Sequence, residues 1–314
     1  MGDVYRHLCK CFPQTYTEQE VLPKEVGRHH HRSARSDSKD HRSRNAENVL
    51  PSLKEGEHQS TSDVIAEQYQ PVPKTKPGLA VSLADRLDSL VGLFAAGMAP
   101  TGTRDPFALR RAAIGVVQPL IEHNLDFDLQ MALRSAASLQ PIPVNDEVLG
   151  QVLEFITGRL RVVLMDMDYG HDVVDAVLAA QASNPAGAAR AVKQFSAWVK
   201  RKDWNTILPA YARCVRITRD QEKKFKLKPE GLVEAEEKTL YTALQKAEKL
   251  ERAAGSADDF LNAFVPMIPA VDAFFEKVMV MTEDRIIQEN RLGLLQRIAT
   301  LAAGVADLSK LEGF

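Results

Sequence analysis

The arrangement of apolar residues predicts a helical protein. From Leu79 onward, apolar side chains recur at the three- and four-residue steps that place them on one face of an α-helix. No segment of useful length alternates apolar and polar residues as a half-buried strand would, and no internal repeat is seen. The fold class is therefore predicted to be all-α. Helices are predicted within 78–97, 106–124, 125–139, 146–167, 171–181, 184–199, 205–220, 232–253, 257–281 and 283–302.

Residues that begin or end helices support these boundaries. Gly97 suits a helix C-terminus, and Asp105 followed by Pro106 predicts an N-cap with proline in the first turn. Phe107 is expected on the buried stripe of that helix. Thr282 is predicted to cap the last long helix, where the acids that follow it suit the positive end of the helix dipole.

The first 60 residues differ from the rest. The stretch "RHHHRSARSDSKDHRSRNAEN" has almost no apolar side chains, so it cannot bury enough surface to offset the entropy lost on ordering. Six of the eight histidines lie before residue 60, and the His29–His31 run would bind a metal only adventitiously. We expect residues 1–60 to be a disordered or aberrant tract.

Composition limits the partners. The formal net charge of the 314 residues is −2, so an anionic partner must be bound by local patches rather than by a global positive field. Three cysteines are too few for a disulfide framework and favour a reducing compartment. No apolar run approaches the ~20 residues that span a membrane, and no partnership with a membrane is expected.

No catalytic constellation is found. The sequence lacks a Gly-rich phosphate loop, a His-Glu-x-x-His motif and a Gly-x-Ser-x-Gly motif. His123 and His171 sit beside predicted helix ends, where solvated or capping histidine is usual. Asp85 lacks histidine partners for a metal, so it is interpreted as a structural carboxylate that meets Arg86, Arg110 or Arg111. No metal site and no catalytic residue are predicted in this chain.

Arginines on one helix form a candidate contact surface for phosphate. Arg213, Arg216 and Arg219 recur at steps of three with no acid between them. Guanidinium groups match phosphate oxygens, which favours a nucleic-acid contact. The alternative is a solvated face paired with the acids of "EGLVEAEE". Both interpretations stay open.

Two further helices carry polar residues near a predicted core. Arg110 borders the buried stripe of its helix, whereas Arg111 points outward. Asn290 shares a face with apolar residues, so it is predicted to be buried and hydrogen bonded in a structural role. Arg291 is longer and is expected to extend past the core to a ligand.

Three motifs resemble one protein family. "LADRLDSLVGLFAAGMAPTGTRDPFALRRAA" resembles the HD-like helical region of the bacterial-type glycyl-tRNA synthetase β subunit, and "AYARCVRI" resembles the start of its C-terminal domain. "FFEKVMVMTEDRIIQENRLGLLQRI" is similar to the end of that domain, a DALR-type anticodon-binding bundle, and "DLSKLEGF" resembles the fused organellar form. The resemblance covers about 57–314 and implies the domains 61–140 (HD-like), 141–204 (connecting) and 205–314 (anticodon-binding).

The resemblance also implies a function. Family members belong to a class II enzyme that charges glycine tRNA through glycyl-adenylate, with ATP and Mg²⁺ used by a catalytic α part. Nothing here resembles the α motifs, so this chain is expected to bind tRNA beside that partner and to hold no cofactor itself. Its predicted tRNA contacts are Arg213, Arg216, Lys277, Arg291, Arg297, Arg110 and Arg111. The location is expected to be intracellular, in a chloroplast or mitochondrion if the source is a plant or alga.

The sequence also departs from the family. The opening "MGDVYR" resembles an internal family turn, so residues 7–55 are interpreted as an insertion or a translated non-coding stretch. Asp85 matches the last aspartate of the HD motif, but the segment for the other ligands is absent, which disfavours a metal-dependent phosphohydrolase. Arg216 stands where the family often has Asn. The rival function is a helical module that packs on the catalytic part without contacting tRNA.

Overall fold

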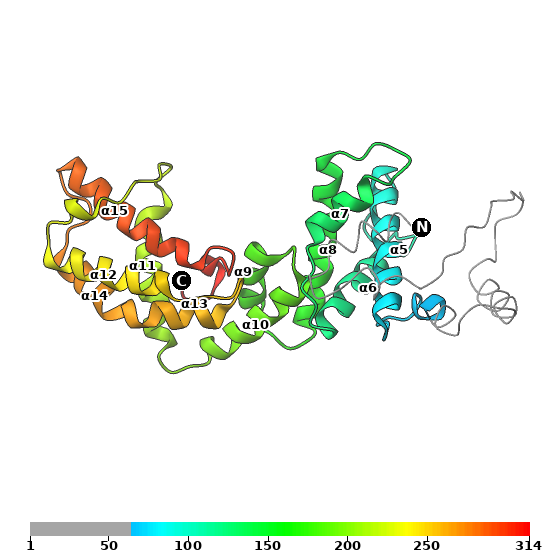
Figure 1. The fold of residues 1–314 in the computed structure, drawn as a ribbon, viewed down its shortest axis with the longest axis horizontal. Coiled ribbons are helices and arrows are strands. Elements are labelled where there is room, and N and C mark those ends of the chain that lie inside the picture. Colours follow the sequence, from blue (N-terminus) through cyan, green and yellow to red (C-terminus); the bar gives the residue numbers. More distant parts are fainter. Residues whose placement is uncertain (1–63) are drawn as a thin grey trace, which may run out of the picture. The chain divides into compact units, whose positions relative to one another are not determined.

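The computed structural model describes residues 64–314, and Figure 1 shows this part as a series of α-helices. Within this range no β-strand forms, apart from an isolated bridge between Thr101 and Arg104. The all-α prediction is confirmed for these residues. The predictions for 1–60, including the insertion at 7–55, lie outside the described residues.

The chain divides into two compact units, and the described part of the first comprises 64–163 and 183–186. Its central helix, α5, packs against α6 and α7. Leu83, Leu87 and Leu90, one face of α5, are fully buried at this contact. The helices of this unit are α5 (Lys76–Ala95), α6 (Leu109–Glu122), α7 (Leu129–Ala137) and most of α8 (Asp146–Met165).

The second unit comprises 164–182 and 187–314. Helix α11 packs against α14 and α15, and α12 packs against α13 and α14. Tyr211 meets Phe260 and Phe264 edge-on, with ring centroids 5.6 and 5.4 Å apart. The helices are α9 (His171–Gln181), α10 (Pro185–Val199), α11 (Trp204–Arg219), α12 (Ala235–Lys249), α13 (Ala257–Phe264), α14 (Ile268–Lys277) and α15 (Arg285–Ala299), with 3-10 turns η2 (Pro229–Gly231), η3 (Val265–Met267), η4 (Thr300–Ala302) and η5 (Leu308–Lys310).

The prediction of one continuous helix over 257–281 is wrong. It is divided into α13, η3 and α14, with Pro266 in η3 and Pro269 in the first turn of α14. Proline has no N–H to donate and its ring crowds the preceding turn, so each one limits how far a helix can continue. The chain then leaves α14 in an extended conformation at Val278, and Met281 is half exposed.

Two predicted helix starts are also corrected. Helix α15 is capped by Asp284 rather than Thr282, because the Asp284 carboxylate accepts from the N–H groups of Ile286 and Ile287 at 2.9 and 3.2 Å. Helix α6 begins at Leu109, four residues after the predicted cap. Asp105 still caps it, since its carboxylate accepts from the N–H groups of Leu109 and Arg110 across a tight turn. That turn leaves Phe107 exposed, contrary to expectation.

Candidate nucleic-acid interface

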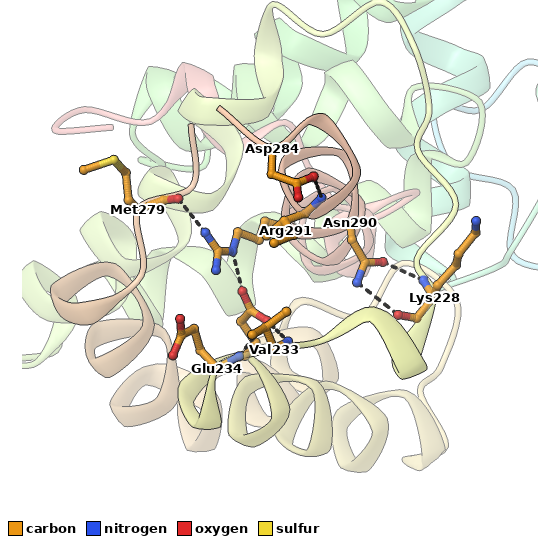
Figure 2. A network of polar contacts seen from close by, with 9 residues as sticks. Lys228, Val233, Glu234, Met279, Asp284, Asn290 and Arg291 are labelled. Carbon is orange, nitrogen blue, oxygen red and sulfur yellow. Dashed lines mark hydrogen bonds and ion pairs between the residues drawn. The ribbon is translucent and has the colours of Figure 1, made fainter. Parts of the chain in front are cut away.

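Asn290 and its neighbour on α15 are both buried, and only the first was expected to be. Asn290 is 6% exposed, and its side-chain amide makes two hydrogen bonds with the backbone of Lys228 (Figure 2). Its Oδ1 accepts from the Lys228 N–H at 2.7 Å, and its Nδ2 donates to the Lys228 carbonyl at 3.0 Å. The expectation that Asn290 is buried and partnered is confirmed.

Arg291 does not reach the surface. Its side chain is 8% exposed and forms an ion pair with Glu237 of α12, itself only 1% exposed. The guanidinium also donates to the Met279 carbonyl at 2.8 Å (Figure 2). The second carboxylate oxygen of Glu237 accepts from the backbone N–H groups of Val233 and Glu234. The prediction that Arg291 extends outward to a ligand is wrong, because its charge is used inside the bundle.

The Arg213 side chain of α11 already contacts two side chains of α14. Its guanidinium pairs with Asp272 of α14 and stands 5.4 Å from the centre of the Phe275 ring. Both members of the ion pair keep about two fifths of their side-chain surface exposed. The arginine is therefore still accessible, but an approaching phosphate would compete with an existing carboxylate.

Two more of the predicted contacts are paired with acids on α12. The Lys277 ammonium donates to Glu236 at 2.7 Å, and this hydrogen bond raises the pKa of the lysine and lowers that of the glutamate. Arg297 forms a two-point pair with Glu248 at 2.5 and 2.7 Å, which raises the pKa of the arginine. The acids of α12 thus neutralise two of the predicted contacts, Lys277 and Arg297. The alternative interpretation, in which the α11 arginines pair with the acids of "EGLVEAEE", is not what the structure shows, because Arg213 pairs with Asp272.

The other end of α11 is less neutralised. Arg216 and Arg219 are exposed, and their guanidinium carbons lie 5.5 and 5.8 Å from the centre of the Phe314 ring. No carboxylate within the described range forms an ion pair with either one. Beside them an open hollow of about 390 Å³ is lined by parts of α9, α11 and the C-terminal residues, including Phe314.

In the first unit, Arg110 and Arg111 differ as expected. Arg110 is partly covered and lies near Asp105, with an N–O distance of 3.9 Å, and it also donates to the Gly102 carbonyl. Arg111 is exposed on the surface of α6. No ion pair of Arg111 is found among residues 64–314.

The expectation that Asp85 pairs with nearby arginines is wrong. Its carboxylate is exposed and makes no ion pair among the described residues. Arg86 instead donates to the carbonyls of Gln68 and Gln70 and to Ser82. Burial lowers the pKa of Arg86, and the negative charge of Asp85 opposes that change.

The described residues also give no support for a metal centre. No three His, Cys, Asp or Glu side chains within 64–314 are grouped so as to hold a metal ion. The His123 ring contacts the Pro73 carbonyl at 2.7 Å, and His171 is the first residue of α9. Within the same residues no helix is both long and apolar enough to cross a bilayer.

Sequence reasoning missed a set of lysines between α11 and α12. Residues 223–228, here called the lysine segment, form no helix or strand and expose Lys224, Lys226 and Lys228. Phe225 and Leu227 between them are half-buried. The alternation of lysines with apolar residues in "KKFKLK" is the available sequence signal. Lys223 is paired with Glu289 at 3.2 Å, whereas the other three lysines have no ion pair in the described part of the chain.

Comparison with known proteins places both units in one family. Residues 52–179 match the model of the glycyl-tRNA synthetase beta subunit, and 207–308 match the DALR anticodon binding domain. The chain is 36% identical over 272 residues to the glycine–tRNA ligase beta subunit of Moorella thermoacetica and 38% identical over 282 residues to that of Myxococcus xanthus. The chain belongs to the glycyl-tRNA synthetase β-subunit family.

The β-subunit relatives are much longer than this chain. The match to the Moorella and Myxococcus proteins covers 82% of this chain but 39% of each relative. A chloroplastic/mitochondrial glycine–tRNA ligase of Arabidopsis thaliana is 37% identical over 245 residues, which is 77% of this chain and 23% of that protein. In this chain, the match to the anticodon-binding domain begins inside α11 and ends in η5. It therefore contains the lysine segment and all of α12–α15.

Proposed function

We propose that this chain is a tRNA-binding part of a glycine–tRNA ligase, and that glycine activation with ATP and Mg²⁺ takes place on a separate catalytic α part. The observation that carries this proposal is the match of α11–η5 to an anticodon-binding domain. The identity of 36 to 38% to β subunits over most of the chain supports it. Solvent-facing cations on the same unit are chemically suited to phosphate.

The surface proposed for tRNA is smaller than the sequence predicted. Arg216 and Arg111 are exposed and free of carboxylates among the described residues, so they are retained as proposed phosphate contacts. Arg110, Arg213, Lys277 and Arg297 are retained as contacts that must first compete with their carboxylates. Arg291 is not retained, because its guanidinium is enclosed. The division into 61–140, 141–204 and 205–314 stays part of the proposal.

Binding of a glycine tRNA transcript by the full 314-residue chain tests this function. The chain is expected to retain the transcript in a filter assay, with an affinity that falls steeply with salt because bound lysines and arginines release counterions. Arg216→Ala is expected to weaken binding and to lower the salt slope by about 0.7 to 0.9, the value for one phosphate contact. No retention at about 50 mM salt would overturn the proposal.

Ion pairing on α12 favours a second function for part of the surface. Because Lys277 and Arg297 are neutralised by Glu236 and Glu248, that face resembles a protein-contact surface more than a phosphate site. The second candidate is a module that packs on the catalytic α part without contacting tRNA. Co-purification with an α part, without retention of tRNA, would favour it over the first.

The cellular location is a further part of the proposal. One relative is named as chloroplastic/mitochondrial, and bacterial relatives are equally similar. A chloroplast or mitochondrion is proposed if the source is a plant or alga, and the cytoplasm otherwise. Fractionation followed by detection of this chain tests it.

A further inference from the structure

Helix α15 holds the lysine segment (223–228) against its surface. Three α15 residues at steps of three, Asn290, Gly293 and Gln296, lie along the contact. Residues three apart on a helix lie near one another, so these three form a continuous line on the helix surface. The backbone of the segment contacts Gln296, Gly293 and Asn290 in turn.

Each end of the line is fixed by a side-chain amide that bonds twice to the backbone. The Gln296 Oε1 accepts from the Phe225 N–H at 2.9 Å, and its Nε2 donates to the Lys223 carbonyl at 2.9 Å. Asn290 makes the corresponding pair of bonds to Lys228. The two amides therefore replace the hydrogen bonds that a neighbouring β-strand would provide.

Gly293 lets the segment lie close to the helix between these two points. A Cβ placed there would come within 3.2 Å of the Leu227 nitrogen and of the Phe225 carbonyl oxygen. Both atoms belong to the backbone, so neither could rotate away. The small residue and the two amides together hold the extended segment in a fixed position.

The fixed backbone places three lysines in a row, and none of them has an ion pair with another residue of 64–314. Exposure alternates along the segment as it does along an extended chain: Phe225 and Leu227 are half-buried, whereas Lys224, Lys226 and Lys228 are exposed. Figure 2 shows the Lys228 side chain directed away from Asn290. At a rise of about 3.3 Å per residue, successive outward lysines are about 6.6 Å apart along the chain. Glu222 and Glu230 flank the row, which still carries a net positive charge.

We propose that the lysine segment is a preorganised binding surface for the backbone of a single RNA strand, with one phosphate at each of Lys224, Lys226 and Lys228. The inference rests on the proposed tRNA function and assigns a particular contact within it. A row one side chain wide follows one strand rather than both strands of a duplex. Lysine acts as a point charge, so the contact positions the RNA and does not read its sequence. Holding the row in place reduces the ordering entropy that binding costs.

A triple charge-removal variant with a matched control tests this proposal. The full chain, Lys224→Ala/Lys226→Ala/Lys228→Ala and the control Lys238→Ala/Lys246→Ala/Lys249→Ala are titrated with glycine tRNA transcript and with its isolated anticodon stem-loop. The control removes the same charge from exposed lysines of α12. Loss of three contacts is expected to lower the salt slope by about 2 and the affinity at about 0.1 M salt by about 100-fold relative to the control.

A second variant tests the positioning without changing charge. Gln296→Ala frees the Lys223–Phe225 end of the segment, so trypsin is expected to cut after Lys223, Lys224 and Lys226 several times faster than in the unaltered chain. Its tRNA affinity is expected to fall while the salt slope is retained, because all three lysines remain. Unchanged trypsin cleavage in the segment would contradict the role given to Gln296.

The outcomes separate this inference from the function on which it rests. If the unaltered chain binds tRNA and both triple variants bind with equal affinity and slope, the lysine-segment proposal fails and the tRNA function stands. If the unaltered chain binds neither the tRNA transcript nor the anticodon stem-loop, both the lysine-segment proposal and the tRNA function fail. If the lysine variant instead loses an acidic catalytic α part in co-purification while tRNA binding is unchanged, the segment is a protein contact and the proposal is overturned.

Discussion

Glu237 shows how one buried residue connects three parts of the second unit. One carboxylate oxygen pairs with Arg291 of α15, and the other accepts from the backbone at the start of α12. Arg291 in turn fixes the chain at Met279, which precedes α15. A buried ion pair is tolerated only when its remaining polar atoms are also bonded, and these contacts meet that condition.

Removing one member of this pair is expected to be strongly destabilising. Arg291→Met leaves the Glu237 carboxylate buried without a cation, which costs about 3–5 kcal/mol of the free energy of unfolding. Adding Glu237→Gln removes the charge but keeps an oxygen for the α12 backbone, so the double variant should recover more than half of the loss. Urea unfolding followed by tryptophan fluorescence measures both, since Trp198 and Trp204 both lie in the second unit. A double variant no more stable than the single one would contradict this explanation.

The buried Cys214 thiol predicts a decrease in stability in alkali. Burial raises its pKa to about 12, whereas a cysteine thiol in the unfolded chain has a pKa of about 8.5. The contribution of the buried thiol to the free energy of unfolding is complete below the pKa of the unfolded chain. It is lost as the pH rises toward the pKa of the folded chain. Between about pH 8.5 and 10 this one group is expected to lower the free energy of unfolding by about 1.4 kcal/mol per pH unit. Measured by urea unfolding across that range, the free energy of unfolding of Cys214→Ala should depend less steeply on pH than that of the unaltered chain. Identical pH dependences would contradict the effect assigned to Cys214.

At the scale of elements, α15 combines packing with the support of a surface. Leu294, Leu295 and Ile298 are fully buried, which the helical spacing predicted. The polar line of Asn290 and Gln296 was not interpreted as a support, because its partner is backbone that has no sequence signature. Ile286, in the first turn of α15, is exposed although it is apolar.

Gly293→Ala is expected to displace the lysine segment from α15. The new methyl group would meet two backbone atoms at 3.2 Å, and overpacking of this kind costs about 1–3 kcal/mol. Tryptophan fluorescence should therefore report a lower midpoint in urea, and trypsin should cut the segment faster. Gly150→Ala in α8, where no atom lies within 4 Å, is the control and should change neither. Equal behaviour of the two variants would show that the close approach at Gly293 is unimportant.

At the scale of the whole molecule, net charge says little about the proposed binding. The chain carries a formal charge of −2, yet the second unit holds an exposed row of three lysines. Acids are abundant on α12, where Glu236, Glu237 and Glu248 each neutralise a predicted contact. The arrangement of charges among elements therefore decides which cations remain for a partner.

The sequence by itself determined the helical class, most helix positions and the family, because these depend on local periodicity and on motifs that are continuous in the chain. It also determined that Asn290 must be buried and bonded. Only the tertiary structure decided which cations are available: Arg291, Arg297 and Lys277 meet acids that are 41 to 54 residues away in the chain. The same holds for the lysine segment, whose position depends on amides of α15 that lie 62 to 73 residues further along. Pairings between such distant residues leave no periodic pattern, so only the folded chain reveals them.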